Sequence, residues 1–141
     1  ERQDFCGYWA CDPYGKLVGF AYGYSGAPGQ WWYDTITVGM DPVLVDRWLS
    51  DYFEFVELAV DPGLQGQGIG GRLHDALLGC TRCATAALTT AQIVTPALHL
   101  YQRRGWTTIR SNYIFPGDDV VRRIMAKDLR PWKPRGPAVS G

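Results

Sequence analysis

The stretch Gln65-Gly66-Gln67-Gly68-Ile69-Gly70-Gly71 decides how this sequence folds. It comes after Tyr52 to Val60, a nearly continuous apolar run that predicts a strand covered on both faces. Apolar residues at three- and four-residue spacing follow it and predict a helix beginning at Gly68. Backbone N–H groups at a helix start are unpaired and aligned with the helix dipole, so this strand, loop and helix favour an anion-binding site.

The glycines allow two interpretations besides an anion site of another kind. Their spacing, Gly66-x-Gly68-x-x-Gly71, matches the dinucleotide fingerprint. However, residues 61–65 separate the strand from the first glycine, and no acidic residue between Asp75 and Asp118 could bind a ribose hydroxyl. A helix merely started by flexible glycines is the second interpretation. Four glycines in six residues, at about 1 kcal/mol each, would then destabilise the helix without a ligand to explain them.

Composition limits the class of protein. The chain has 141 residues, which fits one domain, and its formal net charge is zero, which favours neither nucleic acid nor a membrane surface as partner. No apolar stretch approaches the ~18 residues of a membrane span. The start of the chain, Glu1-Arg-Gln-Asp4, carries no starting Met and no apolar segment, so we expect no signal peptide and a cytoplasmic location. The acid-free stretch contains Arg82, Arg103, Arg104 and Arg110, which predicts a preference for an anionic ligand.

The cysteines and histidines give no strong functional signal. The four cysteines are Cys6, Cys11, Cys80 and Cys83. Cys80 and Cys83 form a CxxC without a second pair at zinc spacing, so no metal site is predicted. Cys80 continues the apolar stripe of its helix, which favours a buried reduced thiol over redox chemistry. His74 and His99 occupy helix positions that should point outward, so we expect surface histidines.

The remaining pattern predicts a mixed α/β protein. Strands are expected at 5–11, 16–25, 52–60, 84–91, 107–115 and 120–129, and helices at 43–49, from Gly68 and at 96–104. Asp41-Pro42 has the chemistry of a helix N-cap followed by the first helical residue, and Gly105 that of a helix stop. Residues 26–33 are expected to be irregular. Residues 130–141, rich in Pro and Arg, are expected to form a poorly ordered tail.

Three segments resemble the GNAT (GCN5-related N-acetyltransferase) superfamily. Its pyrophosphate motif, Gln/Arg-x-x-Gly-x-Gly/Ala, is matched by residues 65–70, and residues 54–62 look like its lead-in strand. Residues 97–106 are similar to the family's Ala-x-x-Leu-Tyr-x-x-x-Gly-Phe segment, with Trp106 in place of Phe. The three segments have the family's order and spacing and together cover about residues 5–129. The resemblance implies a GNAT domain over residues 1–129, with an insertion between strands at 26–51.

The resemblance also implies an architecture. The expected fold is a mixed sheet with helices on both faces, split into a V between the strands at 52–60 and 84–91. The family normally begins with a strand and one or two helices before the hairpin, and this sequence starts at the hairpin. Those elements usually build part of the acceptor site, so they are expected to be either missing or supplied otherwise. The asparagine often found before the tyrosine-bearing helix is replaced by Thr95-Pro96.

The cosubstrate implied by the resemblance is acetyl-CoA. Its pyrophosphate would lie on the glycine loop, and its pantetheine arm would bond to the strand backbone in the V. Arg72 either reaches a cofactor phosphate or is an ordinary exposed arginine. The expected cofactor-binding residues are Leu58, Ala59, Val60, Gln65, Gly66, Gln67, Gly68, Ile69, Gly70, Gly71 and Arg72.

Three residues are candidates for catalysis. Glu54 is at the position where many family members place a glutamate general base, and it is favoured over Glu57. In a regular strand the two would point to opposite faces, although a bulge would change this. The alternative for either is a carboxylate paired with an arginine. Tyr101 is the candidate general acid, because a phenol with a pKa of about 10 stays protonated at neutral pH. Its alternative is an amphipathic core tyrosine.

These residues predict an N-acetyltransferase that moves an acetyl group from acetyl-CoA directly to a primary amine in a ternary complex. The alternative is an acyl-CoA-binding regulatory module without acceptor chemistry. The acceptor is left open between small molecules and protein or peptide amines, and a homodimer is compatible with the resemblance. Trp31, Trp32 and Tyr33 either wall an acceptor pocket or cap the sheet.

Overall fold

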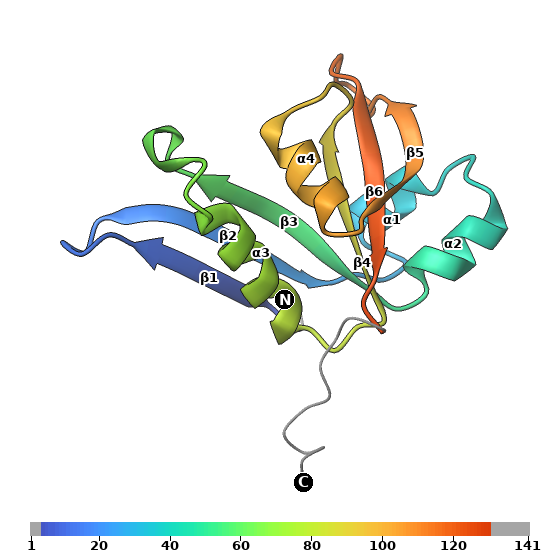
Figure 1. Cartoon of the computed structure of the whole chain (residues 1–141). Helices are drawn as coiled ribbons and strands as arrows, with labels where there is room; N and C mark the ends of the chain where they lie inside the picture. Colours follow the sequence, from blue (N-terminus) through green and yellow to red (C-terminus); the bar gives the residue numbers. More distant parts are fainter. Residues whose placement is uncertain (1–3, 131–141) are drawn as a thin grey trace, which may run out of the picture.

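The computed structural model describes residues 4–130 and shows a six-stranded mixed sheet with helices on both faces (Figure 1). The strands are β1 (Cys6–Cys11), β2 (Leu17–Ser25), β3 (Tyr52–Val60), β4 (Thr85–Ala91), β5 (Thr107–Tyr113) and β6 (Arg122–Asp128). The α-helices are α1 (Trp31–Ile36), α2 (Pro42–Leu49), α3 (Ile69–Cys80) and α4 (Pro96–Arg103), with a short 3₁₀ turn, η1, at Pro62–Leu64. The strand order is β1-β2-β3-β4-β6-β5. The predicted tail lies outside the described residues except for Arg130.

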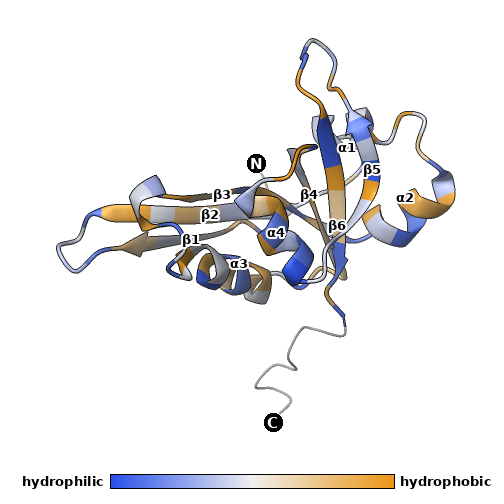
Figure 2. Ribbon diagram, turned by 45° about the horizontal axis from the view of Figure 1, so that its top comes forward, coloured by the Kyte–Doolittle hydropathy of each residue, from blue (hydrophilic) through white to orange (hydrophobic). Residues whose placement is uncertain are grey.

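The sheet is split into two halves between β3 and β4. This pair is parallel, whereas the other neighbouring pairs are antiparallel. Its register runs only from Tyr52 opposite Thr85 to Glu54 opposite Ala87. Beyond Glu54 the two strands diverge, and Figure 2 shows the β1–β3 half and the β4–β6 half running in different directions. The expected V is therefore present, and Glu54 lies at its apex.

Local sequence signals account for several element boundaries. Strand β3 has the predicted bounds. Asp41 caps α2, because its carboxylate accepts a hydrogen bond from the backbone N–H of Val43 at 2.9 Å and Pro42 begins the helix. The Thr95 hydroxyl caps α4 by accepting from the N–H of Leu98 at 3.1 Å. Capping residues thus set the starts of both helices.

Helix α1 corrects one expectation. Residues 26–33 were expected to be irregular, yet a helix begins at Trp31. Its six residues are poor helix formers, and so short a helix would not be stable in isolation. Packing explains it: Ile36 is fully buried, and the rings of Trp32 and Tyr33 lie 5.7 Å and 6.2 Å from the ring of Tyr52. Tertiary contacts override the local propensity.

Each face of the sheet has its own hydrophobic core. The larger core joins the sheet to α3 and α4 and includes Phe53, Phe55 and Leu77. The smaller core joins the opposite face to α1 and α2 and includes Ile36 and Tyr52. Figure 1 shows α3 and α4 on one side of the sheet and α1 and α2 on the other. Among the described residues, no helix has the length and apolar character needed to cross a membrane.

A disulfide joins Cys6 of β1 to Cys80 at the end of α3. The expectation of a reduced thiol at Cys80 is therefore wrong. Cys6 pairs with Gly23, on the face of the sheet that carries α3, so the fold brings together two cysteines that are 74 positions apart. The neighbouring Cys83 and the exposed Cys11 are free. The disulfide fixes the C-terminal end of the helix whose other end carries the glycine loop.

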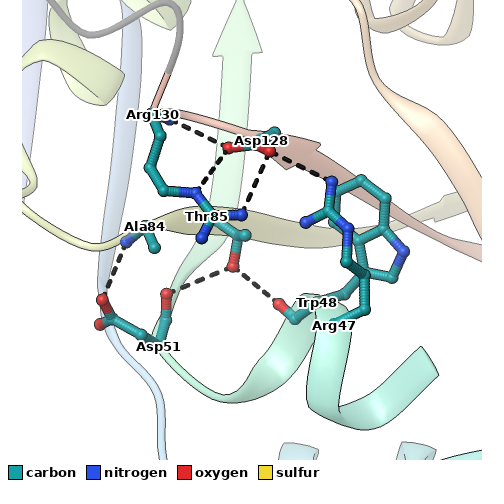
Figure 3. Close-up of polar contacts among 7 residues, drawn as sticks. All are labelled: Arg47, Trp48, Asp51, Ala84, Thr85, Asp128 and Arg130. Carbon is teal, nitrogen blue, oxygen red and sulfur yellow. Dashed lines mark hydrogen bonds and ion pairs between the residues drawn. The ribbon is translucent and has the colours of Figure 1, made fainter. Parts of the chain in front are cut away.

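Polar contacts hold the base of the V together (Figure 3). The seven residues drawn there are Arg47, Trp48, Asp51, Ala84, Thr85, Asp128 and Arg130. The Thr85 hydroxyl donates to the backbone carbonyl of Trp48 at 2.7 Å, which ties the first residue of β4 to α2. Hydrogen bonds from Arg130, with a further contribution from Arg47, lower the pKa of Asp128 to about 2. These contacts link α2, β4 and β6 where the two halves of the sheet still touch.

Candidate active site

The glycine loop between η1 and α3 has the geometry of an anion cradle. Gly66 and Gly68 have φ angles of +85° and +83°, which L side chains rarely adopt. A Cβ added at either position would meet no atom within 4 Å, so the loop faces open space. Gly68 is the N-cap of α3, and no side chain caps the helix there. The first N–H groups of α3 have no intrahelical partners and can therefore serve a phosphate.

A groove with a volume of about 440 Å³ adjoins the loop; we term it the glycine groove. Of the expected cofactor-binding residues, those that line it are Leu58, Val60, Gln65, Gly66, Gly68, Gly70 and Gly71. Gln67, which is exposed, is not among them. Ala59 borders a different depression, Ile69 packs against the larger core, and Arg72 is exposed outside the groove. The structure thus brings most of the predicted set together.

Helix α4 supplies groove residues that the sequence reasoning missed. Pro96, Ala97 and Leu100 form an apolar wall opposite the loop. His99 and Arg103 also line the groove, and His99 is exposed as expected. These two residues are four positions apart, so they share one face of the helix. That spacing, in a stretch free of acids, is the signal for a polar wall to which Arg103 brings a positive charge.

The two candidate carboxylates of β3 lie on the same face of the sheet. Glu54 pairs with Tyr24 and Glu57 pairs with Tyr22, so Val56 is an extra residue between them. Paired residues of an antiparallel ladder point to the same face, and residues two apart on β2 do so as well. The opposite-face expectation for a regular strand therefore does not hold, because β3 carries a bulge.

Glu54 lines a second opening, also of about 440 Å³, which we term the aromatic cavity. Its walls include Trp31, Trp32, Phe55, Phe115, Asp118 and Arg122. Glu54 is 8% exposed, whereas Glu57 is exposed and does not line the cavity. Trp32 packs against the core beneath α1 and α2, and Leu58 and Val60 of the glycine groove pack against the core beneath α3 and α4. The two openings therefore lie on opposite faces of the sheet.

Tyr101 lies in the larger core beside the glycine groove. It is 6% exposed, and its ring centroid lies 5.9 Å from that of Phe55 and 5.7 Å from that of Trp106. It is not among the residues that line the groove, although its neighbour Leu100 is. Burial raises the pKa of the Tyr101 phenol to about 12, so the hydroxyl keeps its proton at neutral pH. Its role in catalysis remains a prediction.

His74 is buried, at 1% exposure, which corrects the expectation of a surface histidine. The indole nitrogen of Trp106 donates to His74 Nε2 at 2.9 Å, and an indole can only donate. Nε2 must therefore be unprotonated, and Nδ1 donates to the Asp75 carboxylate at 2.8 Å. Arg104 forms two hydrogen bonds to the same carboxylate. The burial of His74 depends on Trp106 and α4, which lie far along the chain and carry no local signal that they cover this side of α3.

This network predicts a pH-dependent stability. Desolvation lowers the pKa of His74 below its ordinary 6.5, although Asp75 opposes the shift. Below about pH 6.5 the unfolded chain therefore binds a proton that the folded chain excludes, and stability falls as the pH is lowered. We expect urea unfolding between about pH 7.5 and about pH 5 to show a free energy that drops by at most about 1.4 kcal/mol per pH unit from this group.

The histidine variants identify the group responsible. His74→Leu should flatten this pH dependence, while His99→Gln should retain it, because His99 is exposed. An unchanged slope in His74→Leu would assign the effect to another group.

The fold and the comparisons with known proteins agree. A family model described as the acetyltransferase (GNAT) domain matches residues 4–108, which include the glycine loop, Glu54 and Tyr101. The GCN5-like protein acetyltransferase Rv2170 of Mycobacterium tuberculosis is 35% identical over 121 residues. That match covers 80% of this chain and 59% of the relative, so the chain spans less than two thirds of the relative's length.

Solved structures of low sequence identity share the fold. Nourseothricin acetyltransferase has a TM-score of 0.64 at 18% identity, over 89% of this chain and 66% of that one. The NatC complex bound to Gag peptide and CoA has a TM-score of 0.66 at 15% identity, over 87% of this chain and 70% of that one. Since the family model spans most of the sequence, the chain belongs to the GNAT acetyltransferase family, whose general reaction is acetyl-CoA-dependent acetyl transfer.

Proposed function

We propose that this chain moves an acetyl group from acetyl-CoA directly to a primary amine while both are bound. The observation that supports this most is the glycine groove in the V of the sheet. Loop N–H groups at its end suit the pyrophosphate, and Arg103 adds positive charge. Beyond Glu54 the backbone of Leu58, Ala59 and Val60 is not paired with β4, so it can bond to the pantetheine arm. When bound, acetyl-CoA supplies an activated thioester carbonyl.

The residues at the apex of the V would carry out the proton transfers. An amine arrives as an ammonium ion and must lose a proton before its nitrogen can attack a carbonyl. Glu54 is the carboxylate placed for this, because it lines the aromatic cavity next to the point where β3 and β4 separate. One ammonium proton passes to Glu54, and the C–N bond forms as the C–S bond breaks. The second proton that the nitrogen loses goes to the thiolate, which leaves the amide and a free thiol.

Binding of CoA tests the cradle directly. In calorimetric titrations we expect Gly68→Ala to weaken binding of CoA and acetyl-CoA by roughly tenfold. An L residue pays about 1–2 kcal/mol in the left-handed region, so the free loop would leave the cradle conformation and would have to regain it on binding. Gly79→Ala is the matched control: it lies in α3, and its Cβ would meet nothing within 4 Å. Absence of any heat of binding for the unmodified chain would overturn the proposed function.

Tyr101 is proposed to assist the leaving group by hydrogen bonding. With a pKa of about 12, it is a weaker acid than an ordinary thiol of pKa about 8.5, so full proton transfer to a thiolate would be uphill. A hydrogen bond to a charged sulfur is still worth about 1.5–3 kcal/mol. We therefore expect Tyr101→Phe to lower kcat by about 10- to 100-fold with CoA affinity unchanged, as measured by thiol release and calorimetry. Unaltered turnover would remove Tyr101 from this role.

The second candidate function is an acyl-CoA-binding regulatory module without acceptor chemistry. Glu54 at the apex and an open cavity beside it favour the enzyme instead. Release of free thiol from acetyl-CoA on addition of mixed amines would distinguish the two. A regulatory module would bind CoA with the same heat and release no thiol.

A further inference from the structure

The aromatic cavity restricts which amine this chain would accept, an inference that rests on the proposed function. Its volume of about 440 Å³ is that of a small-molecule site. Three aromatic rings of α1 and of the segment after β5 line it. Trp31 stacks on Phe115 with ring centroids 5.7 Å apart, and Trp32 is backed by the buried ring of Tyr52, also at 5.7 Å. The cavity therefore offers flat apolar walls to whatever lies in it.

The two tryptophans of the cavity differ in how strongly the protein restrains their rings. The Trp32 indole N–H donates to the Thr89 hydroxyl at 2.9 Å, which fixes the ring against the sheet. Trp31 is 64% exposed, so most of its surface is free to contact a ligand. Tryptophan faces attract both aromatic rings and cations. Trp31 is accordingly the wall residue whose removal should matter most to a bound amine.

The charges of the cavity indicate how many positive charges the ligand carries. Three lining side chains are formally charged: Glu54 and Asp118 are negative and Arg122 is positive, which leaves one net negative charge. Arg122 forms an ion pair with Asp118 at 3.5 Å, so its charge is engaged at the rim. A single ammonium matches this balance. A polyamine would bring more positive charge than the cavity offsets, and a free amino acid would bring a carboxylate that competes with Asp118 for Arg122.

We propose that the acceptor is a small aromatic monoamine, whose ring packs against Trp31 while its ammonium points to Glu54. Phenethylamine, n-hexylamine, spermidine and L-phenylalanine serve as probes, with acetyl-CoA as donor and thiol release as readout on the full chain. We expect the highest kcat/KM for phenethylamine, roughly tenfold above spermidine and L-phenylalanine. n-Hexylamine, which has the charge but not the ring, should lie between them.

A pair of tryptophan variants tests the ring contact. Trp31→Ala should lower kcat/KM for phenethylamine by roughly tenfold, and Trp31→Phe should recover most of it. Trp9→Ala is the matched control, because Trp9 is 60% exposed but lies on β1 and does not line the cavity. Saturation transfer NMR with phenethylamine and CoA should show ring contacts that Trp31→Ala weakens and Trp9→Ala does not.

The outcomes separate this inference from the function on which it rests. Preference for spermidine or L-phenylalanine, equal use of n-hexylamine, or equal effects of Trp31→Ala and Trp9→Ala would overturn the acceptor class alone. In those cases acetyl transfer would still be observed. If CoA does not bind, or no amine releases thiol, the proposed function fails and the acceptor class fails with it.

Discussion

Replacing Glu54 with glutamine is expected to lower kcat/KM by about 10²- to 10⁴-fold, the usual contribution of a positioned general base. The substitution keeps the size of the side chain and removes its ability to take a proton from the ammonium. Glu54 lies at the apex of the V, where pairing between β3 and β4 ends. Steady-state thiol release at saturating acetyl-CoA measures the effect. Calorimetry should show unchanged CoA affinity, because Glu54 does not line the glycine groove.

Glu57→Gln is the matched control for this prediction. Glu57 lies on the same face of the sheet three positions further along β3, but it is exposed and outside the aromatic cavity. Its substitution should change kcat/KM by no more than about twofold. The loss of kcat/KM in Glu54→Gln should also become smaller as the pH approaches about 10, because the amine is then deprotonated without a general base. A larger loss in Glu57→Gln than in Glu54→Gln would exchange their roles.

Removing the Cys6–Cys80 disulfide is expected to lower the free energy of unfolding by about 4 kcal/mol. The bridge closes a loop across 74 positions, and the loss of chain entropy in the unfolded state gives this value. It is a large share of the 5–15 kcal/mol by which typical domains are stable, roughly a quarter or more. Urea unfolding of Cys6→Ser against the unmodified chain measures the difference.

The free cysteine Cys11 provides the control. Cys11→Ser should leave the unfolding free energy nearly unchanged, because Cys11 is exposed and unbridged. A reductant should bring the unmodified chain down to the stability of Cys6→Ser and have no further effect on that variant. If reductant leaves the unmodified chain as stable as before, the bridge does not contribute to its stability.

Much of this fold could be predicted because its signals are local. The nine residues of β3 are apolar except for Glu54 and Glu57, and the ends of this run coincide with the observed strand. Asp41 and Pro42 act as cap and first helical residue through contacts within the same turn. Gly105 ends α4 with a φ of +87°, as a glycine after a helix commonly does. Each of these features depends on residues only a few positions apart.

The features that could not be predicted depend on distant partners. The bulge at Val56 is defined by the register with β2, so the spacing of Glu54 and Glu57 does not disclose their common face. The burial of His74 depends on Trp106, which is 32 positions away. The Cys6–Cys80 bridge likewise depends on β1 lying under α3. Sequence patterns therefore predict individual helices and strands more reliably than the contacts between them.

The two openings face opposite sides of the sheet, and this placement affects how reactants could enter and how products could leave. A compound seated in one opening would leave the entrance of the other clear, because the entrances face opposite sides of the sheet and the openings approach each other only where β3 and β4 separate. In the proposed reaction the acetyl donor and the amine could therefore bind in either order, because neither would block the other's opening. In the proposed reaction each product would likewise have its own exit, so the thiol and the amide could leave independently.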